Sequence, residues 1–215
     1  MPTIPYKNKD GKRLSGVTTI IGGNLGWNKE VLNYWHWEQG RDGKDYRETL
    51  TRAADSGTIA HYMIECDLRK TKPDLEKYPA DLVALAQQGF ENYLEWKSMV
   101  RFRPVSMEPH YVSEKWQYGL TPDCIAYVNR KLSLFDWKTS SGVYPEMLIQ
   151  LAAYQEGWNE NNPKHPITGG AYLLRIDKQS ASFHFHHWND LNPGWMAFHH
   201  LLCLHGLQKT LKALV

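Results

Sequence analysis

The strand predicted over residues 132–139, Leu-Ser-Leu-Phe-Asp-Trp-Lys-Thr, constrains the fold more than any other segment. Its leucines, phenylalanine and tryptophan make it apolar, which is typical of a strand covered on both faces. Because side chains alternate along a strand, Asp136 and Lys138 lie on the same face. A buried acid and a buried amine are costly to desolvate, so this pair needs polar partners or a metal ion. The Asp-x-Lys pattern is short, however, and it also fits strand-end residues that simply reach solvent.

A second acid, Asp123, stands thirteen positions before Asp136. Residues 125–128 have the composition of a strand, and the polar residues 129–131 that follow predict a tight turn, so the two strands form a β-hairpin. In this hairpin Asp123 and Asp136 lie near the open end, on neighbouring strands about 5 Å apart. Two carboxylates this close repel each other unless a divalent cation lies between them.

The predicted pair of acids also indicates which ion and which reaction are suitable. Hard oxygen ligands without a cluster of thiolates favour Mg²⁺ or Mn²⁺. A metal ion held by two carboxylates beside a lysine suits the hydrolysis of a phosphodiester, because the metal generates hydroxide and the cations neutralise charge in the transition state. Asp123, Asp136 and Lys138 are therefore the first candidate catalytic residues.

Four short motifs follow one another along the chain: Gly-Thr-Ile-Ala-His at 57–61, Pro-Asp at 122–123, Asp-Trp-Lys at 136–138 and Gln-Leu-Ala-Ala-Tyr at 150–154. In this order they resemble the PD-(D/E)XK nuclease superfamily. The resemblance is strongest to RecB-type nuclease domains, which include phage exonucleases and the mitochondrial genome maintenance exonuclease. It extends over roughly residues 50–190. Each motif is weak alone, and the ordered set of four is specific.

The resemblance implies a restriction-endonuclease-like core in which His61 coordinates the metal together with Asp123 and Asp136. The main-chain carbonyl of Trp137 would be a further ligand, and Lys138 would position or deprotonate the attacking water. By itself a single helical histidine is more often a core or surface residue. Glu65 lies four residues after His61 on the same predicted helix face, where it either orients the imidazole or is a surface charge.

Two further sets of residues have both a functional and an ordinary interpretation. Gln150 and Tyr154 are four apart on a predicted helix that starts near Pro145, so they project together. As neutral groups they can bind phosphate oxygens or steady Lys138, and they also fit the polar face of an ordinary helix. Glu114 is either another acidic ligand or a charge on a surface strand.

The length of 215 residues predicts one domain, with a helical part over 1–105 and a catalytic core over 106–190. Strands are expected at five positions, which together give a central mixed sheet covered by helices on both faces, an α/β fold; they are centred near Tyr111, Ile125, Leu134, Tyr172 and Phe183. The β-branched residues 17–21 predict a strand, with a short capped helix as the alternative. Residues 46–54 predict a helix, and Thr58 predicts the N-cap of another.

Cysteine and histidine usage excludes some sites. Three scattered cysteines indicate a reducing compartment without a disulfide framework, and they are too few for an iron–sulfur cluster. His184 and His186 share a strand face, but no thiolate or suitably spaced partner completes a zinc site. We therefore interpret these two histidines as structural.

The charge balance, 25 Lys and Arg against 23 Asp and Glu, does not suggest a coat for duplex DNA. It is compatible with a nuclease whose acidic metal site offsets basic patches elsewhere. No apolar run is long enough to span a membrane, and the first residues do not form a signal peptide. We therefore expect a cytoplasmic protein, in a bacterial cell or a phage-infected host.

Taken together, the motifs predict a Mg²⁺- or Mn²⁺-dependent deoxyribonuclease, an exonuclease of phage or bacterial recombination and repair. Its substrate would be single-stranded DNA or the end of a duplex, and a recombination protein is the candidate partner. One alternative is a catalytically inactive nuclease fold that binds nucleic acid or serves in assembly. Another is a hydrolase of a different phosphate ester.

Overall fold

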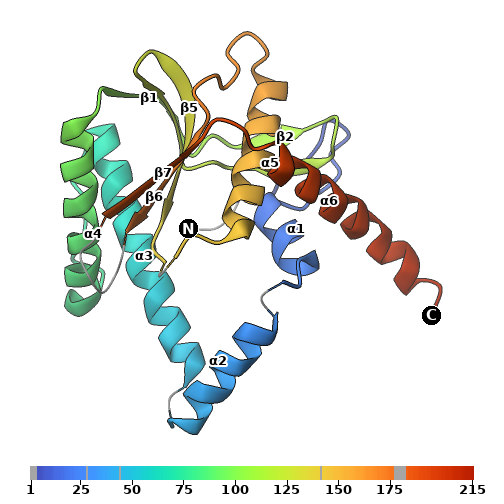
Figure 1. The fold of residues 1–215 in the computed structure, drawn as a ribbon, viewed down its shortest axis with the longest axis horizontal. Coiled ribbons are helices and arrows are strands. Elements are labelled where there is room, and N and C mark those ends of the chain that lie inside the picture. Colours follow the sequence, from blue (N-terminus) through green and yellow to red (C-terminus); the bar gives the residue numbers. More distant parts are fainter. Residues whose placement is uncertain (1–3, 28, 44, 141, 177–182) are drawn as a thin grey trace.

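The computed structural model describes residues 4–27, 29–43, 45–140, 142–176 and 183–215. Figure 1 shows the order of the elements along the chain. The helices are α1 (Val17–Asn24), α2 (Lys29–Arg41), α3 (Tyr46–Arg69), α4 (Ala80–Met99), α5 (Pro145–Asn161) and α6 (Asn192–Lys212). The strands are β1 (Phe102–Met107), β2 (Tyr111–Ser113), β3 (Tyr118–Leu120), β4 (Cys124–Val128), β5 (Lys131–Lys138), β6 (Ala171–Ile176) and β7 (Phe183–Trp188).

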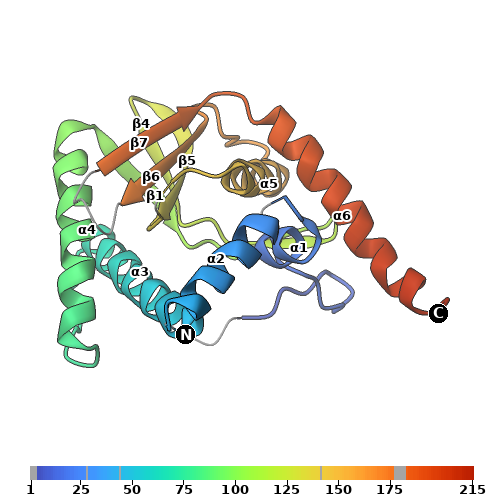
Figure 2. The same ribbon diagram turned by 60° about the horizontal axis from the view of Figure 1, so that its bottom comes forward.

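The centre of the molecule is a mixed sheet in the order β1-β4-β5-β6-β7. β5 and β6 are parallel and are connected through α5, whereas the other neighbouring strands are antiparallel. Helices α3 and α4 lie on one face of this sheet, and α5 lies on the other with α1 and α6 beside it (Figures 1 and 2). The α/β class with a mixed sheet between helical layers is thereby confirmed.

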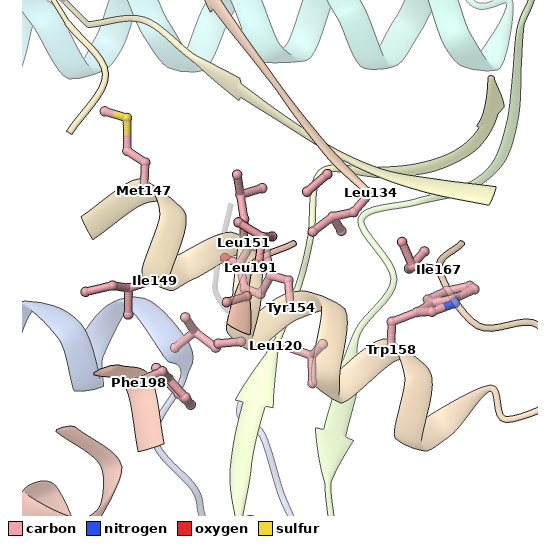
Figure 3. Close-up of a cluster of buried hydrophobic side chains, with 14 of the residues drawn as sticks. Leu120, Leu134, Met147, Ile149, Leu151, Tyr154, Trp158, Ile167, Leu191 and Phe198 are labelled. Atoms are coloured by element: carbon pink, nitrogen blue, oxygen red, sulfur yellow. The ribbon is translucent and has the colours of Figure 1, made fainter. Parts of the chain in front are cut away.

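β5 is buried on both faces, as its composition predicts. Leu132 and Leu134 pack into the core under α5, whereas Phe135 and Trp137 pack into the core under α3 and α4. Figure 3 shows Leu134 in the same buried cluster as three residues of α5, Leu151, Tyr154 and Trp158. Each such side chain contributes about 1.5–3 kcal/mol when it is fully buried. β5 is thus fixed on both sides, and its last residues are held at one end of the sheet.

The hairpin of β4 and β5 has the tight turn that the sequence predicts. Asn129 and Arg130 have φ values of 49° and 69°, a left-handed conformation at both central positions that matches the twist of a two-residue hairpin. Val128 pairs with Lys131, and Cys124 pairs with Phe135. Continued by one residue, this register places Asp123 opposite Asp136, as expected.

Residues 17–21 form the start of α1, so the strand prediction is wrong and the alternative, a short helix, is correct. Val17, Ile20 and Ile21 are buried. Their spacing of three and four places them on one helical face, and packing against α5 and α6 outweighs the strand propensity of β-branched residues. The apolar spacing, rather than composition, was the informative signal in this segment.

The two helices predicted over residues 46–65 form the single helix α3. Thr58 is inside this helix, so its assignment as an N-cap is wrong. The cap is Asp45, whose side chain accepts a hydrogen bond from the backbone NH of Arg47. Ser56 and Gly57 are buried, which indicates that these small residues allow close packing along the helix rather than ending it.

The strand predicted around Tyr111 exists, but its predicted place in the central sheet is wrong. Tyr111–Ser113 pairs with Tyr118–Leu120 in a separate two-stranded sheet. The fifth place in the central sheet is taken by β1, which starts at Phe102 and pairs with β4. The turn predicted over residues 177–180 lies outside the described residues, although the strands on either side of it pair as expected.

Two further observations concern the whole chain. Cys66, Cys124 and Cys203 are all free thiols. Over the part of the chain that the structure describes, none of the helices combines the length and the apolar character that crossing a bilayer requires.

Candidate active site at the open end of the central hairpin

The two acids meet where β4 begins and β5 ends. Asp123 immediately precedes β4, and its Oδ2 accepts a hydrogen bond of 2.8 Å from the backbone NH of Trp137. This bond draws the Asp123 side chain across the end of β5. Asp136 is only 1% exposed, so its carboxylate is removed from solvent. The hairpin therefore brings one half-buried and one fully buried carboxylate together.

Lys138 provides the positive charge next to Asp136. Its Nζ lies 2.6 Å from Asp136 Oδ2, and both side chains project from the face of the sheet that α5 covers. The other oxygen, Asp136 Oδ1, is buried and has no hydrogen-bond partner among the described residues. A buried carboxylate oxygen without a partner is costly unless a ligand satisfies it. This oxygen is therefore available to coordinate a cation.

His61 reaches the site from α3, although it is far from the two acids in the sequence. Its Nδ1 lies 3.9 Å from Asp123 Oδ2. Glu65, one turn further along α3, accepts a hydrogen bond of 2.7 Å from Arg69, and within the described residues no hydrogen bond joins it to His61. The structure thus brings the imidazole to the acids, whereas the Glu65 carboxylate pairs with Arg69 of the same helix.

The charges at the site influence one another. The pKa of Asp123 is raised, first because the side chain is buried and second because Asp136 is close; His61, Lys138 and the Trp137 NH oppose this shift. Burial alone would lower the pKa of Lys138, but the attraction of Asp136 and Asp123 outweighs it, so the pKa is raised. Without a metal, Lys138 is therefore a cation that balances the acids.

Gln150 and Tyr154 face each other on α5. The Gln150 amide donates a hydrogen bond of 2.8 Å to the Tyr154 hydroxyl. Tyr154 is 5% exposed, and its pKa lies well above the usual value, because of burial first and then because of the charges of Asp136 and Asp123. The hydroxyl is therefore a neutral donor in the field of the two acids.

Glu108 was not identified from the sequence. It directly follows β1, has a φ of 45°, and its backbone NH donates to the Asp123 carbonyl at 2.9 Å. Its side chain lines a small recess together with His61, Glu65 and Asp123, and its pKa is raised by burial and then by these two acids. The Pro109 that follows it was the available signal, because a proline there disfavours a continuous strand.

Glu114, the acid that the sequence singled out instead, lies between β2 and β3. There it accepts a hydrogen bond of 2.8 Å from the backbone NH of Lys9. Its carboxylate fixes the N-terminal segment against the two-stranded sheet. The interpretation as a charge of that surface strand pair is the one that fits its contacts.

The donor atoms suit a hard divalent cation. Among the described residues, no three His, Cys, Asp or Glu side chains are already arranged as a set of metal ligands. The unpartnered Asp136 Oδ1 and the repulsion between Asp123 and Asp136 are nevertheless the features that such a cation would relieve. The carboxylate oxygens therefore fit Mg²⁺ or Mn²⁺, and His61 supplies an imidazole nitrogen beside Asp123.

No protein-family model matches the sequence, and no curated protein matches it. One solved structure that this chain partly resembles comes from Eubacterium rectale and is described as a candidate exonuclease. It is 11% identical with a TM-score of 0.48, and the match covers 67% of this chain and 64% of that one. An alkaline exonuclease from Laribacter hongkongensis is 14% identical with a TM-score of 0.34, over 76% of this chain and 92% of that one. This chain thus spans slightly less than two thirds of the first protein. At this level of similarity, the activities of those proteins do not transfer to this chain.

Proposed function

We propose that this chain is a Mg²⁺- or Mn²⁺-dependent deoxyribonuclease that hydrolyses phosphodiester bonds. The proposal depends above all on one observation: the buried Asp136 has one oxygen paired with Lys138 and one oxygen free, beside Asp123. The order of the four motifs supports the same activity. At the finer level, we propose an exonuclease of phage or bacterial recombination and repair, acting in the cytoplasm on single-stranded DNA or on a duplex end.

Each protein residue has a role that follows from its contacts. When bound, the divalent ion would polarise the phosphate and make a bound water more acidic. Asp136 and Asp123 would hold the ion, Asp123 being oriented by the Trp137 NH, with His61 and the Trp137 carbonyl as further ligands. Lys138 would act as a cation that stabilises charge on the phosphate oxygens, in keeping with its raised pKa.

The α5 residues would act on the substrate rather than on the ion. The Tyr154 hydroxyl, which already accepts from Gln150, keeps its own proton for donation because its pKa is raised. A neutral donor can bind a phosphate oxygen without altering the charge that holds the cation. We therefore assign Gln150 and Tyr154 to positioning of the phosphate or of Lys138.

The test is digestion of end-labelled linear, circular and single-stranded DNA with Mn²⁺ and with EDTA. Wild type is expected to cleave with Mn²⁺ only, and Asp136→Asn is expected to lose at least about 100-fold in rate, as for other losses of transition-state charge stabilisation. A matched control is Asp67→Asn, because Asp67 Oδ2 also lies 2.6 Å from a lysine, Lys97, but on α3 and α4. This control is expected to cleave normally.

Two results would contradict the proposal. Digestion by Asp136→Asn at the wild-type rate would remove the assigned site. A wild-type protein that binds DNA but leaves every substrate intact with Mn²⁺ would instead indicate the inactive nucleic-acid-binding alternative. Comparison with a small phosphate monoester tests the remaining alternative, a different phosphate ester as substrate.

A further inference from the structure

A second polar cavity lies at the closed end of the same hairpin, away from the candidate active site. It is an open pocket of about 760 Å³ between the start of β1 and the turn of the β4–β5 hairpin. Its lining consists of three arginines with two aromatic residues and one amide, namely Arg101, Phe102, Arg103, Tyr127, Asn129 and Arg130. None of these residues has a part in the chemistry proposed above.

The three arginines are exposed and uncompensated. No carboxylate of the described residues lies within 4.0 Å of the guanidinium groups of Arg101, Arg103 or Arg130. The surrounding segments 96–107 and 124–135 contain no Asp or Glu at all. In a chain whose net charge is only +2, this concentration of positive charge is local. Guanidinium groups stay charged at every physiological pH, so the pocket attracts anions.

The pocket also has a fixed shape. Arg103 pairs with Tyr127 across β1 and β4, and its guanidinium carbon lies 4.6 Å from the centre of the Tyr127 ring. Stacking of this kind restricts the orientation of the planar group. Arg130 is held by the left-handed turn. The backbone is therefore fixed at Arg103 by strand pairing and at Arg130 by the turn, and the guanidinium of Arg103 is also held against a ring.

The distance to the active site is set by the length of the strands. Tyr127 is paired with Leu132, which is four residues before Asp136 on β5, and Arg130 is six residues before it. At about 3.3 Å per residue, the pocket begins about 13 Å from Asp136 and extends to about 20 Å. Along a duplex with a rise of about 3.4 Å per base pair, this span corresponds to about four to six base pairs.

We propose that this arginine pocket binds backbone phosphates of the DNA several nucleotides away from the bond that is cut. The choice of DNA rests on the proposed function; the pocket itself is inferred from its own residues. Guanidinium groups bind phosphate through paired hydrogen bonds. The aromatic side chains beside them can contact sugars and bases without a preference for sequence. The pocket would hold the substrate without reading its sequence.

The first test measures DNA binding in EDTA, where no cleavage interferes. The test variant is Arg101→Gln/Arg103→Gln/Arg130→Gly; the last change creates an Asn-Gly turn, which suits the left-handed conformation and preserves the hairpin. The control removes three exposed charges elsewhere, Lys72→Gln/Lys77→Gln/Lys164→Gln. The test variant is expected to bind a 20-nucleotide strand at least about 10-fold more weakly than the control. The slope of the logarithm of its binding constant against the logarithm of the salt concentration is expected to be smaller by about 2.

The second test uses substrate length with Mn²⁺ present. On a dinucleotide, whose single phosphodiester bond would occupy the active site, the test variant and wild type are expected to have the same kcat and KM. On a 20-nucleotide strand the variant is expected to have an increased KM and an unchanged kcat. Equal binding by the variant and the control, or a KM effect that is independent of length, would overturn the proposal.

The outcomes separate this inference from the proposed function. If wild type never cleaves but the arginine variant still loses DNA binding selectively, the nuclease proposal fails and the pocket assignment stands. If wild type cleaves and the variant binds normally, only the pocket assignment fails. Poly-glutamate serves as a polyanion without phosphate: an equal loss of its binding would overturn the assignment to phosphate.

Discussion

At the scale of single residues, the Asp136–Lys138 pair has two consequences for stability. Asp136 is 1% exposed and the Lys138 side chain 23%, so removal of the amine leaves a buried carboxylate without compensation. In metal-free protein at pH 7, Lys138→Met is expected to lower the free energy of unfolding by about 3 kcal/mol. The double variant Asp136→Asn/Lys138→Met is expected to recover most of that loss while remaining inactive. Urea unfolding in EDTA measures the free energy of unfolding of both variants.

The pair of Asp67 and Lys97 provides the comparison. Its N–O distance is the same, but its side chains are 25% and 32% exposed. Lys97→Met is therefore expected to cost no more than about 1 kcal/mol, as for exposed pairs. A Lys138→Met protein as stable as Lys97→Met would show that the Lys138 amine does not compensate the buried Asp136 side chain.

Asp123 makes the stability of the metal-free protein depend on pH, and a bound metal is expected to remove this dependence. Its pKa is raised in the folded state, first by burial and then by Asp136. Ionisation of Asp123 is therefore more costly in the folded than in the unfolded chain, and stability falls as the pH rises from below the unfolded pKa through the raised folded pKa. In EDTA, Asp123→Asn is expected to be more stable than wild type at pH 7.

The same variant is expected to lose this advantage in acid, where Asp123 is protonated in both states. Urea unfolding at pH 7 and near pH 3 is the measurement. A constant difference between Asp123→Asn and wild type at both values would rule out the titration of Asp123 as the cause.

At the scale of elements, α3 and the end of β5 are in close contact. A Cβ built on Gly57 would lie 2.5 Å from Thr139 Oγ1, just after Lys138. Gly57→Ala is therefore expected to displace the Thr139 segment, to lower stability and to reduce activity several-fold, even though alanine favours a helix by about 1 kcal/mol. Adding Thr139→Ala removes the oxygen and is expected to restore both activity and stability.

Gly206 is the control for this effect. It lies inside α6, and a Cβ there meets nothing within 4 Å. Gly206→Ala is expected to stabilise the protein by about 0.5–1 kcal/mol without a change in activity. If Gly57→Ala behaved like Gly206→Ala in thermal unfolding and in cleavage assays, the contact with Thr139 would not constrain the site.

Comparison of the elements shows what local sequence can predict. The β4–β5 hairpin was predictable because strand composition, turn and register are all encoded within about fifteen residues. The single helix α3 was not, because Ser56 and Gly57 resemble a start signal and only their burial shows that they are packing positions. β2 was assigned to the wrong sheet, since the choice of strand partner depends on residues far away in the chain.

The same distinction applies to the site. Asp123, Asp136 and Lys138 followed from one hairpin, whereas His61 could be included only through the resemblance of ordered motifs. Glu108 was missed because its position depends on the end of β1 and on a hydrogen bond to Asp123. For residues that converge from separate elements, a local signal such as Pro109 marks at most the end of a strand and does not show which other residues lie beside it.

At the scale of the whole molecule, metal binding should couple the hairpin to α3. A ligand that binds only the folded state at 100 times its Kd adds about 2.7 kcal/mol of stability. For a chain of this size, that corresponds to an increase in Tm of roughly 5–10 °C. Saturating Mn²⁺ is expected to produce such an increase in wild type and none in Asp136→Asn. Calorimetry measures it without reference to cleavage.

His61→Ala tests whether α3 takes part. Because this imidazole lies 3.9 Å from Asp123, its removal is expected to reduce the Mn²⁺-dependent increase in Tm without changing the metal-free Tm by more than about 1 °C, as for partly exposed positions. An unchanged increase would place the ion on the hairpin alone.

The two-residue turn at Asn129 and Arg130 has an evolutionary consequence. It sets the register of the hairpin, and in a strand a slip of one residue moves each side chain to the opposite face. An insertion of one residue within β5, between the turn and Asp136, would exchange the faces of Asp136 and Lys138 with those of Phe135 and Trp137 if the turn stayed unchanged. Homologous chains that keep this site are therefore expected to place a single-residue insertion in the turn or in a β-bulge, where the faces of the strand residues stay unchanged.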